Sequence, residues 1–196
     1  MAKKGFFGRN KIIIIVIAVV VILAIYVVNS RNAMVTKELE VDNAWAQVQN
    51  VYERRLDLIP NLAESVKGYM QMEKDIFESI AEARAGISSA GTPADIENVN
   101  KEISSFIGDL KVVVEDTPEL KASETVIDLM TQLEGTENRI TTERGRFNET
   151  VKVYNTFINM FPRNMIAKLF GFESREFFEA REGAEVAPEV DLSLEE

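Results

Sequence analysis

The stretch from residue 41 to residue 62, VDNAWAQVQNVYERRLDLIPNL, decides the fold, because apolar side chains recur in it at alternating steps of four and three. The same pattern continues to residue 87, and twelve of its fourteen positions are apolar. The positions of this first seam are Val41, Trp45, Val48, Tyr52, Arg55, Ile59, Leu62, Val66, Tyr69, Glu73, Ile76, Ile80, Ala83 and Ile87. Such spacing places side chains on one face of an α-helix and predicts a helix over about residues 37–87.

Two further seams follow along the chain. The second runs from Ile96 to Val113 with six apolar positions of six, and the third runs from Val126 to Phe161 with nine of eleven. They predict helices over about residues 93–114 and 118–160, and no strand-like alternation occurs beyond residue 30. We therefore expect an all-α protein in which residues 31–180 form a long up-and-down bundle of three to four helices.

Pro60 leaves the number of helices open. It lies inside the first seam, where a proline lacks a backbone donor and clashes with the carbonyl four residues earlier, so it kinks or breaks a helix. The unbroken phase of the seam favours a kink, whereas a break would give four helices. Other boundaries are clearer, because Thr92-Pro93 and Thr117-Pro118 are typical helix starts. Residues 163–170 predict a short amphipathic helix that ends at Gly171.

Residues 12–28, IIIIVIAVVVILAIYVV, are seventeen consecutive apolar residues. As a helix they span roughly 26 Å, close to the ~30 Å hydrocarbon core of a bilayer, and they predict a transmembrane helix. A buried core helix and a cleaved signal peptide are the alternatives. Four basic residues lie within the predicted cytoplasmic segment 1–11, and only Arg31 and Lys37 follow the span closely. The positive-inside rule then places the body on the other side of the membrane.

The composition excludes many kinds of site. The chain has no Cys and no His, which removes Cys nucleophiles, Cys/His zinc sites, Ser-His-Asp triads and His general bases. Acidic residues outnumber basic ones by 32 to 22, which disfavours phosphate binding and argues against a nucleic-acid partner. We expect no catalytic, cofactor-binding or metal-binding residue, and a protein that is not an enzyme.

Four charged residues occupy positions on the apolar seams. Arg55 and Glu73 lie on the first seam, and Glu137 and Arg144 lie on the third. One interpretation is that they form buried ion pairs that fix the register of the helices, and the other is that their side chains reach solvent. The first two lie 18 residues apart and the last two lie 7 apart, so one register allows at most one direct pair between the seams.

Aromatic side chains gather toward the end of the chain. Tyr154 and Phe161 end the third seam, and Phe170 and Phe172 follow them. These residues either cap the core of the bundle or form an exposed docking patch for a partner or a membrane surface. Trp45, the only Trp, is expected in the core. Residues 181–196 are acidic, and we expect them to be a disordered tail.

The three predicted helices differ in length, so they cannot cover one another completely. The uncovered part would be the end of the third seam, from Phe147 to Phe161. Exposed apolar surface there predicts side-by-side packing with other copies of the chain, and thus a homo-oligomer. Folding of the short helix at 163–170 over this surface is the alternative.

Several short motifs carry a family resemblance. They are Ala44-Trp45, Tyr52, Arg54-Arg55-Leu56-Asp57-Leu58-Ile59-Pro60-Asn61-Leu62, Val66-Lys67-Gly68-Tyr69, Glu82-Ala83-Arg84-Ala85, Glu137-Asn138-Arg139-Ile140, Tyr154-Asn155, Phe161-Pro162, Ala167 and Phe170-Gly171-Phe172. With the N-terminal span, this pattern resembles the LemA family over roughly residues 10–190. The resemblance implies a single-span bacterial membrane protein with a four-helix up-and-down body and without enzyme activity or cofactor. It also favours a break at Pro60.

Two functions are compatible with these observations. The first is a membrane-anchored, non-enzymatic scaffold of the bacterial cell envelope that self-associates through its helical body, with that body on the periplasmic side of the cytoplasmic (inner) membrane. The second is an accessory subunit of a membrane enzyme such as a metallopeptidase, because the resemblance implies envelope functions and some members of the family are encoded near membrane metallopeptidases. In both cases residues 12–28 contact the lipid bilayer, and an envelope protein is a candidate partner.

Overall fold

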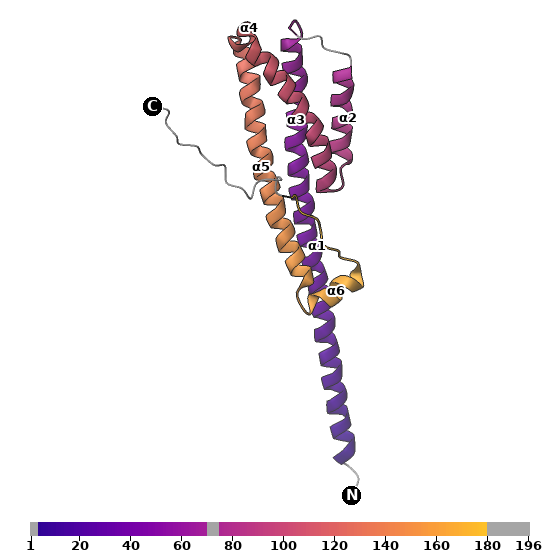
Figure 1. Ribbon diagram of the computed structural model, residues 1–196. Helices are drawn as coiled ribbons and strands as arrows, with labels where there is room; N and C mark the ends of the chain where they lie inside the picture. Colours follow the sequence, from indigo (N-terminus) through magenta and orange to yellow (C-terminus); the bar gives the residue numbers. More distant parts are fainter. Residues whose placement is uncertain (1–3, 70–74, 180–196) are drawn as a thin grey trace, which may run out of the picture.

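The computed structural model describes residues 4–69 and 75–179, and every regular element in these ranges is a helix. The chain forms an elongated bundle from which one end of the first helix protrudes (Figure 1). The helices are α1 (Lys4–Val66), α2 (Asp75–Ser89), α3 (Pro93–Asp116), α4 (Pro118–Lys121), α5 (Glu124–Asn159) and α6 (Arg163–Phe170). The all-α class predicted from the seams is confirmed.

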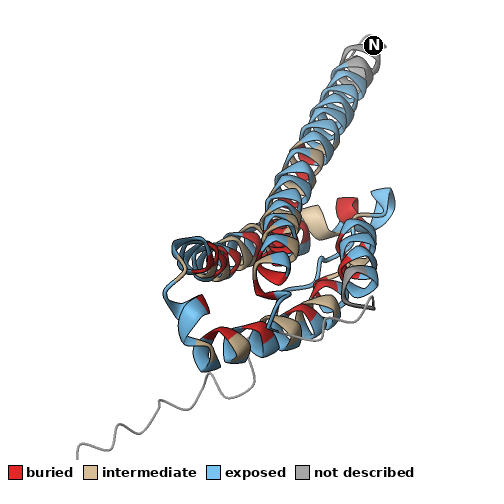
Figure 2. Cartoon of the chain, turned by 90° about the horizontal axis from the view of Figure 1, so that it is seen from above, coloured by how far each residue is buried: buried red, intermediate tan, exposed pale blue. Residues whose placement is uncertain are grey.

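α1 is a single helix of 63 residues that contains both the apolar stretch 12–28 and the start of the first seam. Between residues 11 and 26 every side chain is exposed, whereas from Met34 onward buried side chains recur along one side (Figure 2). At 1.5 Å per residue, α1 is about 95 Å long. The predicted transmembrane helix and the bundle are therefore joined without an intervening loop.

Pro60 lies inside α1 and does not end it. The helix continues to Val66, and the chain turns at residues 67–69. The single helix expected over residues 37–87 is therefore wrong, and so is the alternative of a break at Pro60 that the family resemblance favoured. Leu56, Ile59 and Leu62 are almost completely buried, so packing on both sides of the proline holds the helix despite the missing hydrogen bond. The turn contains Gly68, a residue of low helix propensity, which favours a helix end there.

Four helices make up the body in an up-and-down order. α1 leads away from the protruding end, α2 returns, α3 leads away again, and α5 returns along α1 (Figure 1). α1 and α5 form the most extensive pair, and α2 and α3 pack beside the part of α1 that is farthest from the N-terminus. α4 is one turn between α3 and α5. The four-helix alternative is thus confirmed, with its first turn after Val66.

The predicted seams form the core. Buried seam positions are Val41, Val48, Tyr52, Ile59, Leu62 and Val66 on α1, Ile96, Ile103 and Leu110 on α3, and Val126, Leu133, Ile140, Phe147, Val151, Tyr154 and Ile158 on α5. The expectation that the end of the third seam is uncovered is wrong, because α1 runs unbroken from the apolar stretch and packs along it. Phe161 is the exception, with 80% of its surface exposed.

Local sequence fixes the ends of two helices and one close contact. The Asp95 N–H donates to Thr92 Oγ1 at 3.3 Å and the Thr92 N–H donates to Asp95 Oδ2 at 2.9 Å, so the predicted start of α3 carries a capping box. Gly171 ends α6 with a φ of +75°, as predicted. At Gly86 of α2, a Cβ would approach Val99 Cγ2 to 2.8 Å, so glycine permits the close packing of α2 on α3.

Candidate functional site

Arg55 is the centre of a polar layer inside the bundle. Only 6% of this residue is exposed, because α1 presents it toward α3 and α5. Its guanidinium lies 2.8 Å from Glu137 Oε2 of α5 and donates to Asn100 Oδ1 of α3 at 2.9 Å. The predicted direct pair between the first and third seams is therefore Arg55–Glu137, and this pair links three helices.

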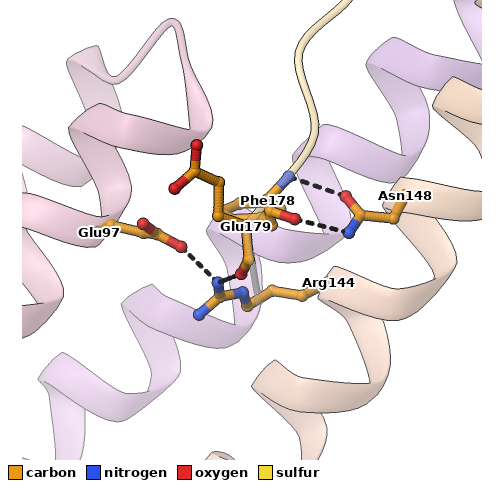
Figure 3. Close-up of polar contacts among 5 residues, drawn as sticks. All are labelled: Glu97, Arg144, Asn148, Phe178 and Glu179. Carbon is orange, nitrogen blue, oxygen red and sulfur yellow. Dashed lines mark hydrogen bonds and ion pairs between the residues drawn. The ribbon is translucent and has the colours of Figure 1, made fainter. Parts of the chain in front are cut away.

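Arg144 forms the second half of the polar layer. It follows Glu137 by seven residues on α5, so both side chains lie on the same side of the helix. The Arg144 guanidinium pairs with Glu97 of α3 and donates to the backbone carbonyl of Glu179 at 3.2 Å (Figure 3). Its Cζ also lies 4.6 Å from the centre of the Phe178 ring, a cation–π distance.

Tyr52 lies on α1 between the two ion pairs and is completely buried. Burial raises the pKa of Tyr52, since it disfavours the phenolate, and the Arg144 and Arg55 guanidiniums offset part of this effect. Glu137 adds to the rise because it is a like charge for the phenolate. At neutral pH the hydroxyl is therefore held in its neutral form.

The polar layer carries no net charge, because its charged side chains form ion pairs with one another. Two guanidiniums, Arg55 and Arg144, face two carboxylates, Glu137 and Glu97. Among the described residues no group of three or more carboxylates could hold a metal ion. Arg55 is buried and the other three groups are partly buried. Ion pairs in such places hold a helix register, because removing one partner weakens the compensation of the other charge. The arrangement therefore supports fixed packing of α1, α3 and α5.

Residues 172–179 form an irregular segment, here the strap, that runs antiparallel to α5 and also contacts α1. Asn148 and Asn155 of α5 hold it by its backbone. Asn148 Nδ2 donates to the Phe178 carbonyl at 2.9 Å, and Asn148 Oδ1 accepts from the Phe178 N–H at 2.8 Å (Figure 3). Asn155 holds Arg175 in the same way, at 2.8 and 2.9 Å. Three residues of extended chain and two turns of α-helix both span about 10 Å. The spacing from Arg175 to Phe178 on the strap therefore matches the spacing from Asn155 to Asn148 on α5.

Aromatic packing and charge complete the attachment of the strap. Phe178 lies 5.9 Å from Trp45 and 5.4 Å from Phe147, and Trp45 lies 5.3 Å from Phe147, all between ring centroids. Arg175 lies 3.0 Å from Glu38 and 3.5 Å from Asp42 of α1. The strap thus connects α5 to the part of α1 that follows the apolar stretch 12–28.

The other predicted site residues fall into different surroundings. Trp45 is half-buried in the aromatic cluster and Phe172 is partly buried against the core. Tyr154 is completely buried, and burial raises its pKa, with Glu38 adding to the rise. Phe170 is exposed and lies beneath the Arg31 guanidinium, 5.6 Å from ring centre to Cζ. Glu73 and the tail 181–196 lie outside the described residues.

Sequence reasoning missed the partners Glu97, Asn100, Asn148 and Asn155. Glu97 and Asn100 lie beside the second seam, where a search for apolar positions ignores them. Asn148 and Asn155 carry a signal in their spacing, since seven residues place two amides on one side of a helix. That spacing alone does not say what the amides hold.

Comparison with known proteins gives consistent results. The model of the LemA family matches residues 44–192. Protein LemA of Metamycoplasma hominis is 25% identical over 170 residues, which cover 85% of this chain and 75% of that protein. Magnetosome protein MamQ of Magnetospirillum gryphiswaldense is 24% identical over 192 residues, which cover 83% of this chain and 71% of the relative. Magnetosome protein MamQ 2 of Paramagnetospirillum magneticum is 26% identical over 195 residues, which cover 86% and 71%.

The matched region begins at Ala44, just before Trp45, and includes the polar layer, the strap and three of the four body helices entirely. It covers well over half of the chain. On the evidence of this match and of the helical bundle itself, the chain belongs to the LemA family.

Proposed function

We propose that the chain is a membrane-anchored, non-enzymatic scaffold of the bacterial cell envelope that self-associates through its helical body. The observation that carries the proposal is the continuity of α1. One helix holds an apolar stretch whose side chains are exposed on every side, and the same helix then forms the core of the bundle. A helix that is apolar all round suits lipid, so the stretch 12–28 would hold the body at a membrane.

Features of the body support a structural role. The charged side chains inside the body form ion pairs with one another in the polar layer. The strap is held by hydrogen bonds between its backbone and the Asn148 and Asn155 side chains. A shallow groove between α1 and α5 has a largely apolar floor and is lined by Lys37, Lys152, Val153, Thr156, Phe157 and Met160. Val153 and Met160 expose 42% and 54% of their surfaces, and so could contact a second copy. Anchoring raises the effective concentration of neighbours, so weak contacts are sufficient for assembly.

Self-association is tested with the full-length protein in a mild detergent. We expect a homogeneous homo-oligomer by mass measurement. The variant Val153→Lys should shift it toward monomer, because it replaces an exposed apolar side chain of the groove by a third positive charge beside Lys37 and Lys152. Thr141→Lys, at an exposed polar position of the same helix, is the matched control. A strict monomer at high concentration would refute self-association. A foreign protein that co-purifies at fixed stoichiometry would favour the accessory-subunit function instead.

The side of the membrane is tested with fusions at the C-terminus of the full chain. The basic segment before residue 12 predicts that the body lies outside the cytoplasm. A fused alkaline phosphatase should be active there and a fused green fluorescent protein dark. The opposite pair of results would reverse the proposed orientation.

A further inference from the structure

α6 carries an apolar face that no described residue covers. Phe161, Met165 and Leu169 expose 80%, 65% and 75% of their surfaces. Met165 and Leu169 are spaced by four residues within α6, so they lie on one side of the helix, and Phe161 lies in the turn just before it; these three residues are here called the row. Ile166 and Ala167 on the other side are buried against the bundle. α6 is therefore docked on the body by one apolar face while a second apolar face points away from it.

The position of this row relative to the apolar stretch follows from the register of α1 and α5. Arg55 lies opposite Glu137, Trp45 opposite Phe147, and Lys37 opposite Phe157. The two antiparallel helices thus advance in step, and Phe161 comes to lie opposite about residue 33 of α1. That level is roughly 8 Å beyond the end of the stretch 12–28, at 1.5 Å per residue. The headgroup layer of a bilayer has a similar thickness, about 5–8 Å on each side.

Two other observations favour lipid over protein as the partner of this row. The turn between α5 and α6 is the part of the body that lies nearest to the protruding end of α1 (Figure 1). The segment 160–172, MFPRNMIAKLFGF, has two basic residues, Arg163 and Lys168, and no acidic one, although the whole chain is acidic. Arg31 of α1 lies over the Phe170 ring at the same level. A basic segment with exposed aromatic and aliphatic side chains is typical of a helix in the membrane interface.

We propose that α6 lies in the headgroup layer of the bilayer, with Phe161, Met165 and Leu169 in contact with lipid chains and with Arg163 and Lys168 near anionic headgroups. The body then touches the membrane at two places, through α1 and through α6, and its orientation is fixed about the axis of α1. This inference rests on the proposed function, because it requires residues 12–28 to lie in a bilayer.

The absence of Cys from the chain permits a direct test. Single-cysteine variants of the full-length protein carry a fluorescent label at Leu169, at Val20 in the apolar stretch, or at Val112 of α3. They are reconstituted in nanodiscs made of equal parts phosphatidylcholine and phosphatidylglycerol, with and without a lipid that carries a nitroxide quencher near the headgroup. All three positions are exposed in the structure, at 75%, 59% and 55%, so the label does not enter the core.

We expect the quencher lipid to lower the fluorescence at Leu169 and at Val20 by on the order of twofold, and to leave Val112 unchanged, because only the first two would lie within the bilayer or its interface. A label at Leu169 that behaves like the one at Val112, while Val20 is quenched, would overturn the role of α6 and leave the anchor intact. A label at Val20 that stays fully accessible to water would overturn both. A label at Leu169 that is shielded from water but not quenched would indicate a protein partner and overturn lipid contact.

Discussion

Residues 12–28 and residues 41–66 belong to one helix, but they are built for different surroundings. The first region is Ile, Val, Leu, Ala and a single Tyr on all sides, and its side chains are exposed except that of Val27, which is partly buried. The second places apolar residues on one side and Glu, Arg, Asp and Asn on the other, and its apolar side is buried. The backbone is helical in both, so helix formation alone does not distinguish them.

The difference lies in how each region specifies its neighbours. A helix that is apolar all round suits lipid in any rotation about its axis, because every face presents the same kind of surface. The body part of α1 presents one stripe, and the stripe carries Arg55, whose charge needs Glu137 at one particular height. In α1, residues 12–28 therefore have no preferred rotation toward their surroundings, whereas residues 41–66 have one preferred position against α5. Each of the following predictions tests that contrast.

The largest expected effect comes from one substitution made at two places on α1. Ile59→Ala removes a side chain that is 1% exposed and should lower the free energy of unfolding of the bundle by about 4 kcal/mol. Ile17→Ala removes one that is 57% exposed and should leave that free energy unchanged. Urea unfolding of the full chain in detergent, followed by the fluorescence of Trp45, measures both. Equal effects would mean that the two halves of α1 do not differ as described.

The next effect concerns the charge on the stripe. Arg55→Met removes the buried guanidinium that pairs with Glu137 and binds Asn100, and should destabilise the bundle by about 3 kcal/mol. Arg54→Met, at the neighbouring exposed position, should cost less than about 0.5 kcal/mol. The double variant Arg55→Met with Glu137→Leu should recover most of the loss, because no charge is then left alone. A double variant as unstable as the single one would show that Arg55 acts through Asn100 instead.

A substitution at Pro60 is expected to raise the free energy of unfolding, whereas the two preceding ones lower it. The body part of α1 contains this proline without breaking, so packing compensates for a defect of about 3 kcal/mol in a helix interior. Pro60→Ala restores the backbone donor but makes the unfolded chain more flexible, and we expect a net gain of about 2 kcal/mol in the same urea experiment. No gain would mean that the helix around Pro60 holds its carbonyls by other bonds.

The smallest effect concerns Tyr52 and alkaline pH. The raised pKa of Tyr52 means that the unfolded chain loses its phenol proton first, so the bundle should lose stability as pH rises above about 10. Tyr52→Phe should change stability by less than about 1 kcal/mol at pH 7 and should reduce the alkaline loss. An unchanged alkaline loss in Tyr52→Phe would assign it to other groups, with Tyr154 the first to examine.

The periodic part of this fold could be predicted from the sequence because packing repeats every seven residues. Val41, Val48, Ile59 and Leu62 are buried as their positions in the seam require. The turn after Val66 was not predictable from the same seam. The heptad spacing of apolar residues continues in α2 through Ile80, Ala83 and Ile87. Two antiparallel helices can carry such a continuous spacing as well as one long helix can. Gly68 was the only local sign of a turn, and a lone glycine is weak evidence.

Some of the polar contacts could likewise be predicted from the sequence, and others could not. Arg55 and Glu137 were found because they interrupt an apolar pattern, and an interruption is visible in the sequence. Glu97 could not be assigned to Arg144, since the pair depends on the height at which α3 crosses α5, which is set by the length of the turns between them. The strap was missed because the Asn148 and Asn155 side chains bind its backbone groups, and backbone groups are the same in every sequence.

The unbroken course of α1 has a mechanical consequence. From Val28 to Val66 the helix rises by about 57 Å, and no hinge separates the two residues. Transmembrane helices tilt by about 20° on average from the bilayer normal, with tilts up to about 40°. Tilting α1 by about 20° would carry the far tip of the body sideways by roughly 20 Å. Because the tilt of a spanning helix adjusts to bilayer thickness, a small change of thickness around residues 12–28 would become a large displacement at the tip.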